Sequence, residues 1–251
     1  MKVTVLTPSK NSGRTIEDTL RSVREQTYVN IEHIVVDGHS TDGVAEILDK
    51  YRSPNLRVIR GRDKNMYDAI NKGLAAATGD VVAVLNSDDV YADREVIGDV
   101  VQKFVESGAD SVYGDIVYVR QDDLNRVVRY WRSGEWNRRD IERGWTPPHT
   151  AFFIKKRVYD TYGGYDIDYR IAADYEITLR FLYTRRITAA YLHRLCTRMR
   201  LGGMSNRSLS CMLQKSKEDH RACKAHSLRH PALTVMMKNL RKATQFIERV
   251  Q

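Results

Sequence analysis

The stretch VVAVLNSDD, residues 81–89, joins an apolar run to a polar end that carries two neighbouring carboxylates. A short run rich in β-branched residues is typical of a strand buried on both faces, as in a parallel sheet. Asp88 and Asp89 follow it directly, and adjacent acids repel one another unless a cation or another polar group offsets their charge. The stretch therefore predicts a buried strand that brings a charged site to one edge of a sheet.

Three similar runs come before this strand, and helical patterns separate them. The predicted strands cover residues 3–7, 32–37, 56–60 and 81–86. Apolar residues recur at helical spacing in four segments: Ile16, Leu20 and Val23; Val44, Ile47, Leu48 and Tyr51; Tyr67, Ile70 and Leu74; Val96, Val100, Val101 and Phe104. This alternation predicts an α/β fold with a mainly parallel central sheet flanked by helices.

Every predicted strand ends in polar residues, in the sequences TPSKN, DGHSTDG, GRDKN and NSDD. Ligands of such sheets bind beyond the carboxyl ends of the strands, so one edge is expected to collect several acids. These acids are Asp37, Asp42, Asp63, Asp88 and Asp89. Helix capping and turn formation account for Asp42 or Ser40 taken singly, but explain the whole set poorly.

Hard divalent cations are the natural partners of this edge. Mg²⁺ and Mn²⁺ prefer carboxylate oxygens, and Mg²⁺ is usually held by one or two of them together with substrate phosphates. Asp37 is followed by Gly38, which allows close backbone approach, so its carboxylate can accept hydrogen bonds from a base or a ribose. The sequence thus predicts a nucleotide site with a cation at its phosphates.

The charge of the chain is basic and uneven. Lysine and arginine outnumber aspartate and glutamate by 41 to 32 in 251 residues, a formal net charge of +9. Residues 207–251 alone hold ten basic and three acidic side chains. Such a balance suggests anionic surroundings, and charge alone does not choose among a nucleotide, phospholipid headgroups and nucleic acid.

Compartment signals point to the cytoplasm. The three cysteines make an odd number without a disulfide-framework spacing. The N-terminus opens on a predicted strand without a basic and apolar leader, and no stretch approaches the roughly 18 apolar residues that span a bilayer. We therefore expect a cytoplasmic protein whose membrane contact is at most peripheral, at the inner face of the cytoplasmic membrane.

After Val119 the alternation becomes irregular. Residues 132–148, which include Trp136 and Trp145, form no regular pattern. Strands are predicted at 127–131, 149–154, 187–192 and 196–201, and helices at 156–162 and up to Tyr183.

From Ser205 onward the pattern is helical. The last segment has an apolar stripe of Leu233, Met236, Met237, Leu240, Ile247 and Val250 beside Lys238, Arg241, Lys242 and Arg249. A basic amphipathic helix of this kind can lie on an anionic membrane surface, on the catalytic domain or on a second subunit, and the sequence leaves these open. Four residues of zinc-ligand type lie within the helical rhythm without an ordinary finger spacing, so we expect no metal site there. They are Cys211, His220, Cys223 and His226.

Four motifs together resemble family 2 glycosyltransferases, which are inverting enzymes with the GT-A fold. They are DGHSTDG, MYDAINKG, NSDD and GGYD…RIAADYEI, and they occur in the family's order and at about its spacing. The opening VLTPSKN and the late GGMSN extend the resemblance over residues 2 to about 205. It implies a GT-A domain over 1–205, with a Rossmann-like nucleotide-sugar-binding half (1–120) and an acceptor-binding half (121–205). Residues 206–251 would be a basic helical extension.

The resemblance implies a nucleotide-sugar donor, most often a UDP-sugar, held with Mn²⁺ or Mg²⁺. Thr7, Pro8 and Asn11 would line the nucleoside, with Asp37 at the uracil or ribose, and residues near the sugar and phosphates would be Asp68, Asn71 and Lys72. The other expected nucleotide-sugar-binding residues are Gly38, Ser40, Asp63, Asn86, Ser87 and Asp88, and the role of Asn86 would shift to the ribose or to a water-mediated metal contact. Asp88 matches the metal-holding acid, and Asp89 is a second candidate. Asn86 stands where many relatives have an acid, and Asn65 where many have glycine.

Inversion requires a base for the acceptor hydroxyl, on the face opposite the leaving group. Asp174 matches the family's base, and its small or apolar neighbours favour a partly desolvated carboxylate. Capping of the following helix is the alternative role, and Glu176 is the second candidate base. His149 and Trp145 are candidate acceptor or phosphate contacts, or core residues.

The resemblance implies a saccharide or polyprenyl-diphosphate-linked acceptor in bacterial surface polysaccharide or glycolipid synthesis. A sugar-phosphate nucleotidyltransferase is the alternative, although TPSKNSGRT lacks the glycine density of its loop. A nucleic-acid-binding module would leave the acidic edge unexplained, so we expect no nucleic-acid partner.

Overall fold

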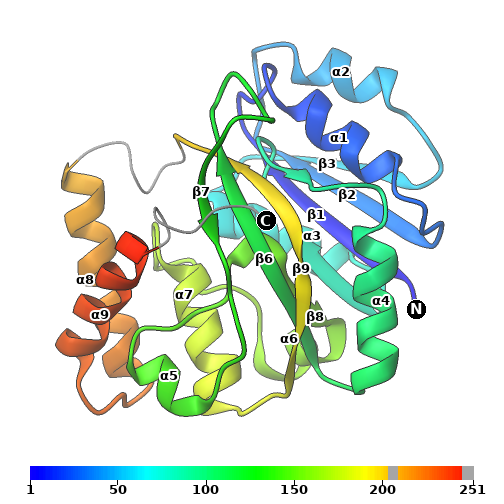
Figure 1. Cartoon of the computed structure of the whole chain (residues 1–251). Helices are drawn as coiled ribbons and strands as arrows, with labels where there is room; N and C mark the ends of the chain where they lie inside the picture. Colours follow the sequence, from blue (N-terminus) through cyan, green and yellow to red (C-terminus); the bar gives the residue numbers. More distant parts are fainter. Residues whose placement is uncertain (203–208, 245–251) are drawn as a thin grey trace.

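The computed structural model describes residues 1–202 and 209–244 (Figure 1). The predicted GGMSN turn, from Gly203, and the stripe residues Ile247 and Val250 with Arg249 lie outside the described residues. The predicted α/β fold is confirmed. Its first half consists of β1 (Val3–Ser9), α1 (Ile16–Arg24), β2 (Ile31–Asp37), α2 (Val44–Lys50), β3 (Leu56–Arg60), α3 (Met66–Ala76) and β4 (Val81–Val84).

The second half is less regular. Its elements are β5 (Val90–Tyr91), α4 (Val96–Ser107), β6 (Ser111–Val119), β7 (Val127–Trp131), α5 (Arg138–Glu142), a 3₁₀ turn η1 (His149–Ala151), β8 (Phe152–Lys155), α6 (Lys156–Tyr162), α7 (Ala173–Thr178), a π-helical segment η2 (Leu179–Thr184) and β9 (Ala189–Arg200). The helices α8 (Leu209–Ala225) and α9 (Pro231–Thr244) follow.

One sheet organises the molecule, in the order β3-β2-β1-β4-β8-β6-β9-β5, with β7 paired to β6. The strands β3, β2, β1 and β4 are parallel, as predicted. The strand β8 is antiparallel to both β4 and β6, so the second half of the sheet is mixed. Because Ser9 pairs with Asp37, the loops after β1 and β2 leave the sheet side by side.

Several details of the second half differ from the predictions. The helix α5 lies within residues 132–148, where no regular pattern was predicted. The stretch 111–119 forms the long strand β6, which the sequence patterns did not indicate. The two predicted strands at 187–192 and 196–201 are one strand, β9. The predicted strand at 149–154 begins as the turn η1.

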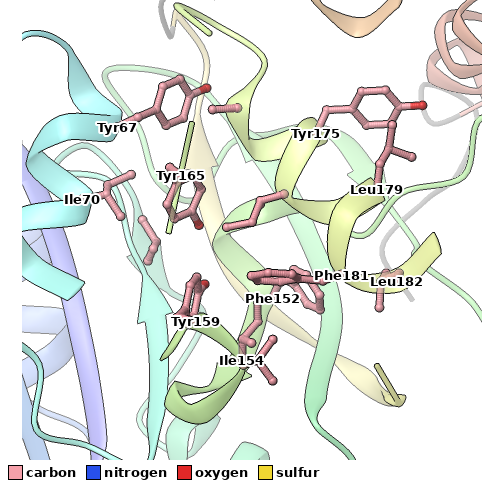
Figure 2. Packing of buried hydrophobic residues seen from close by; sticks show 14 of the residues in the cluster. Tyr67, Ile70, Phe152, Ile154, Tyr159, Tyr165, Tyr175, Leu179, Phe181 and Leu182 are labelled. Atoms are coloured by element: carbon pink, nitrogen blue, oxygen red, sulfur yellow. The ribbon is translucent and has the colours of Figure 1, made fainter. Parts of the chain in front are cut away.

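Alternate residues of the strands enter different cores. Leu6 packs with α3, α6 and α7 in the larger cluster, whereas Val5 packs with α4 in a second cluster on the opposite face. Figure 2 shows the larger cluster, in which Tyr67 and Tyr165 stack with ring centroids 5.7 Å apart. This stacking joins α3, which follows β3, to the segment that precedes α7.

The helices α8 and α9 lie beside α5 and α7, away from α1 and α2 (Figure 1). Their buried residues Cys223 and Val235 belong to the same core cluster as Leu6 of β1. In the described ranges, no helix combines the length and the apolar character needed to cross a membrane.

Candidate active site

The nucleoside end of the predicted site is held together by its own loops. Asp37 is buried at the end of β2, and its Oδ1 accepts hydrogen bonds from the backbone N–H (3.2 Å) and the hydroxyl (2.5 Å) of Ser40. The Ser40 hydroxyl also accepts the Asn11 N–H at 2.8 Å, while Asn11 Oδ1 accepts the Thr41 N–H at 3.0 Å. The loops after β1 and β2 are thereby fixed against each other.

Gly38 follows Asp37 and lies close to the side chain of Asp63. Its N–H donates to the Ser9 carbonyl at 2.9 Å, and a Cβ on it would lie 3.1 Å from Asp63 Oδ2. The hydroxyl of Thr7, by contrast, is buried against His33 Nε2 at 2.9 Å. Pro8 follows Thr7 in β1 and is also buried. The Thr7 hydroxyl is thus used within the fold, and the predicted contacts of Thr7 and Pro8 with a nucleoside stay a prediction.

Lys72 bridges two of the predicted acids. Its Nζ lies 2.6 Å from Asp63 Oδ1 and 3.3 Å from Asp68 Oδ2. The hydrogen bond to Asp63 raises the pKa of Lys72, and the hydrogen bond from the Lys64 N–H lowers the pKa of Asp68. Lys72 and Asp68 therefore stay ionised near neutral pH, and Lys72 joins Asp68 to Asp63, which lies next to Gly38.

Two asparagines connect α3 to the segment before α7. Asn65 caps α3 by accepting the Asp68 N–H at 3.0 Å, and its Nδ2 donates to the Ile167 carbonyl at 2.9 Å. Its φ of −160° is ordinary extended backbone, so this position does not require glycine. Asn71 exchanges two hydrogen bonds with the backbone of Tyr165, at 2.7 and 2.8 Å. The Asn71 amide is thus used within the fold.

Asp89 is buried in the loop after β4. Its Oδ1 accepts the Arg200 N–H at 3.0 Å and its Oδ2 accepts Asn86 Nδ2 at 2.9 Å. Burial, together with the charge of Asp88, raises the pKa of Asp89 well above its usual range. With both oxygens occupied, Asp89 holds the loop in shape, which favours Asp88 over Asp89 as the metal ligand.

Arg200, at the end of β9, anchors the same loop. Its guanidinium donates to the Asp88 carbonyl at 2.7 Å and to Asp18 Oδ2 at 2.5 Å. Thr15 adds a hydrogen bond to the Ser87 carbonyl at 2.9 Å. Sequence reasoning did not single out Arg200, Asp18 or Thr15, because each lies far along the chain from residues 86–89 and no local motif marks it.

The residues of this loop fit a hard cation. The side-chain oxygen Oδ1 of Asn86 is buried and has no hydrogen-bond partner in the part of the chain that the structure describes. An amide oxygen and the carboxylate of Asp88 are the oxygen ligands that Mg²⁺ and Mn²⁺ accept. Within 1–202 and 209–244 no three His, Cys, Asp or Glu side chains form a complete metal site, so further ligands would come from the substrate.

The predicted base lies in the first turn of α7. The N-cap of this helix is Ala172, and Asp174 Oδ1 accepts the neighbouring Tyr175 N–H at 2.9 Å. Asp174 is therefore not the cap of the helix. Burial raises the pKa of Tyr67 well above its usual range, and the nearby charge of Asp174 raises it further.

His149 belongs to the same group of side chains. Its Nε2 lies 2.8 Å from the Tyr165 hydroxyl. Burial lowers the pKa of His149, and the charge of Asp174 only partly opposes this. The imidazole is therefore mainly neutral near pH 7. His149, a candidate contact of the acceptor or a phosphate, lies near enough to the candidate base Asp174 to sense its charge.

The remaining candidates are engaged in the core. Trp145 is buried, donates from Nε1 to the Ser133 carbonyl at 2.9 Å and stacks on Trp136. Glu176 is buried between Arg180 (2.9 Å) and His226 (3.0 Å). These contacts favour packing for Trp145 and an ion pair for Glu176, in place of the predicted substrate contacts.

The comparisons with known proteins agree with this geometry. Residues 4–162 match the family described as Glycosyl transferase family 2. The chain is 29% identical over 208 residues to the "PGL/p-HBAD biosynthesis glycosyltransferase" of Mycobacterium tuberculosis, covering 80% of this chain and 78% of that protein. It is 33% identical over 186 residues to another M. tuberculosis glycosyltransferase, covering 71% and 68%.

Solved structures show the same fold. TarS 1-349 from S. aureus, in complex with UDP-GlcNAc, superposes with a TM-score of 0.68 at 16% identity, covering 98% of this chain and 93% of that chain. The mannosyltransferase PcManGT from Pyrobaculum calidifontis, in complex with GDP-Man and Mn²⁺, gives 0.67 at 18% identity, covering 98% and 73%. The chain spans 43% of a longer TarS chain. The protein thus has the GT-A fold and belongs to glycosyl transferase family 2.

Proposed function

We propose that this glycosyltransferase is metal-dependent and inverting, and that it transfers a sugar from a UDP-sugar. The observation that carries the proposal is the loop after β4, where the buried Oδ1 of Asn86 lies two residues from Asp88 and has no hydrogen-bond partner among the described residues. Solved relatives of the same fold contain UDP, UDP-GlcNAc, or GDP-Man with Mn²⁺.

In this mechanism Asn86 and Asp88 would hold Mn²⁺ or Mg²⁺. The cation, when bound, stabilises the negative charge that develops on the departing diphosphate. Asp37 would accept hydrogen bonds from the uracil or the ribose, and Lys72 would lie toward the sugar and phosphates with Asp63 and Asp68.

Asp174 would accept the proton of the acceptor hydroxyl. As the acceptor oxygen forms its bond to the anomeric carbon, the bond from that carbon to the diphosphate oxygen breaks and UDP leaves. His149, neutral and bonded to Tyr165, would orient the acceptor beside Asp174. Attack from the face opposite the diphosphate gives a product of inverted configuration.

The acceptor we propose is a lipid-linked saccharide or glycolipid precursor. A relative is named for PGL/p-HBAD biosynthesis, and the surface of the terminal helices supports the proposal. Met212 and Leu213 of α8 and Leu233, Met236 and Leu240 of α9 are exposed. Both acids of α8, Glu218 and Asp219, are buried, so the exposed charges of α8 are basic. Such a surface suits peripheral contact with an anionic membrane.

The test is UDP binding with and without Mn²⁺, measured by calorimetry for wild type, Asp88→Asn and the control Asp49→Asn. Asp49 lies at the exposed end of α2 in a surface ion pair. We expect Mn²⁺ to strengthen UDP binding in wild type and in the control. In Asp88→Asn the ratio of UDP affinity with Mn²⁺ to that without it should be at least about ten-fold smaller, because a cation ligand is removed. An unchanged gain in Asp88→Asn would rule out the metal role of this loop.

A further inference from the structure

The carboxylate of Glu218, on α8, is bound by three consecutive backbone N–H groups. Its Oε1 accepts the Arg170 N–H at 3.1 Å, and its Oε2 accepts the N–H groups of Ile171 at 2.8 Å and Ala172 at 2.9 Å. Ala172 is the N-cap of α7, and Asp174 lies two residues further on. One side chain of the terminal helices therefore fixes the backbone that leads directly into the candidate base.

The segment before α7 also accepts hydrogen bonds from α3 and its N-cap. The Tyr67 hydroxyl donates to the Ile171 carbonyl at 2.6 Å, and Asn65 Nδ2 donates to the Ile167 carbonyl at 2.9 Å. Ile171 thus gives its N–H to Glu218 and its carbonyl to Tyr67. Residues 167–172 are held between a helix that carries donor-site residues and a helix of the C-terminal extension.

Glu218 is itself held rigidly by its surroundings. The next residue, Asp219, is buried between Lys238 Nζ at 2.8 Å and Lys215 Nζ at 3.1 Å. Lys238 Nζ also lies 3.4 Å from the centre of the Tyr175 ring, so the ion cluster contacts α7 next to Asp174. These contacts fix α8 relative to α7, and with it the Glu218 carboxylate.

Glu218 stays ionised and does not reach a substrate. It is 4% exposed, and Gln214 Nε2 adds a fourth hydrogen bond at 2.8 Å. Burial would raise the pKa of Glu218, but the hydrogen bonds from Gln214 and the three N–H groups outweigh it and lower the pKa. Because both oxygens of this carboxylate are engaged by the protein, any effect of Glu218 on the reaction passes through the groups that it holds.

We propose that Glu218 is a positioning residue for the reaction: from the C-terminal extension, its carboxylate holds residues 170–172 so that Asp174 faces the acceptor. This rests on the proposed function, in which Asp174 is the base. It makes α8 part of the catalytic machinery, although the family match ends at residue 162. Its loss should lower turnover without changing how UDP binds.

The test compares Glu218→Gln with Glu106→Gln. Glu106 accepts Gln102 Nε2 at 2.7 Å on α4, the same four-residue spacing as Gln214 and Glu218, but Glu106 is exposed and this partner belongs to its own helix. Amide hydrogen exchange followed by mass spectrometry should show faster exchange of residues 167–175 in Glu218→Gln only. Equal exchange in the two variants would overturn the proposal.

Activity separates positioning from mere stability. The readout is Mn²⁺-dependent release of UDP from UDP-glucose, UDP-galactose and UDP-GlcNAc, with water as acceptor, well below the unfolding temperature of every variant. For the donor that wild type hydrolyses fastest, we expect Glu218→Gln to lower kcat by about ten-fold or more, with UDP affinity within about two-fold of wild type. A kcat equal to that of Glu106→Gln would overturn the proposal.

A double variant shows whether Glu218 acts through Asp174. Added to Asp174→Asn, Glu218→Gln should cause little further loss of kcat, because the group that it places is already disabled. If Glu218→Gln lowers kcat as much in the Asp174→Asn protein as it does in the wild-type protein, the proposal is overturned. If instead Asp174→Asn alone keeps near-normal hydrolysis, the base assignment fails, while the exchange experiment still reports whether Glu218 holds residues 170–172.

Discussion

Asp174 has the neighbours that a proton acceptor needs. It lies in the first turn of α7, close to the neutral His149 and to the buried Tyr67 and Tyr165. The hydroxyls of these tyrosines keep their protons at neutral pH, because burial raises their pKa values well above the usual range. Asp174 and His149 are therefore the groups of this cluster that can accept a proton, and His149 Nε2 is already engaged with the Tyr165 hydroxyl.

Replacing Asp174 by Asn should separate binding from chemistry. The amide has nearly the same shape but cannot accept the proton, so we expect transfer to fall by on the order of 10² or more. UDP binding in Mn²⁺ should stay within about two-fold, since residues 86–88 are unchanged. Single-turnover assays beside calorimetry measure both quantities, and near-normal turnover would show that another group is the base.

Among the helices, α9 packs against a glycine that lies just after α5. Gly144 has a φ of +81°, and a Cβ on it would lie 2.3 Å from the backbone nitrogen of Lys238. Thr234 and Arg241 add hydrogen bonds to the carbonyls of Glu142 and Arg143. The backbone of α9 therefore packs directly on the end of α5.

Gly144→Ala should weaken this docking. The left-handed backbone alone costs a non-glycine residue about 1–2 kcal/mol, and the clash with α9 adds to it. Gly134→Ala is the matched control, because Gly134 has a φ of +66° but open space around it. Urea unfolding should show a larger loss of stability for Gly144→Ala, and equal losses would contradict the direct packing.

The elements also show what local sequence patterns can and cannot predict. The strands β1 to β4 are predicted because each contains a short run rich in β-branched residues. The strand β6 was missed because Gly114 and Asp115 interrupt its pattern. Distant partners explain both residues: a Cβ on Gly114 would lie 2.4 Å from Cys196 Sγ, and Asp115 accepts hydrogen bonds from Tyr130 and Tyr191.

In the candidate site, too, local patterns predict some residues and miss others. The polar strand ends predicted Asp37, Asp63 and Asp88 because each follows its own strand. Arg200 and Glu218 act on loops 112 and 46 to 48 residues away, and no local pattern carries such a contact. Helical spacing likewise predicts the apolar stripe of α9, but it does not predict which face of the helix is buried. Lys238 is buried and Leu233 is exposed.

At the scale of the whole molecule, the net charge of +9 is joined to an exposed apolar row on α9. A surface with both properties gains from headgroup attraction and from burial of side chains at the interface. The attraction is screened by salt, whereas the apolar contribution is not. Binding should therefore need anionic lipid and weaken as salt is added.

Replacing Leu233, Met236 and Leu240 together by Gln should abolish most vesicle binding. Co-sedimentation with phosphatidylcholine vesicles, with and without phosphatidylglycerol, measures it. Val105→Gln is the control, because Val105 is an exposed apolar residue of α4. Equal co-sedimentation of wild type and the triple variant would place the membrane contact elsewhere or exclude it.

The strands at the borders of the sheet are short or charged. The border strand β3 has five residues, with Arg57 and Arg60 exposed, and β5 has two. β7 has five residues and meets β6 with an irregular register near Val119. Borders of this kind are poor templates for the backbone of a second molecule. A crowded solution of this protein should therefore resist the strand-to-strand aggregation to which a long, flat, apolar border would expose it.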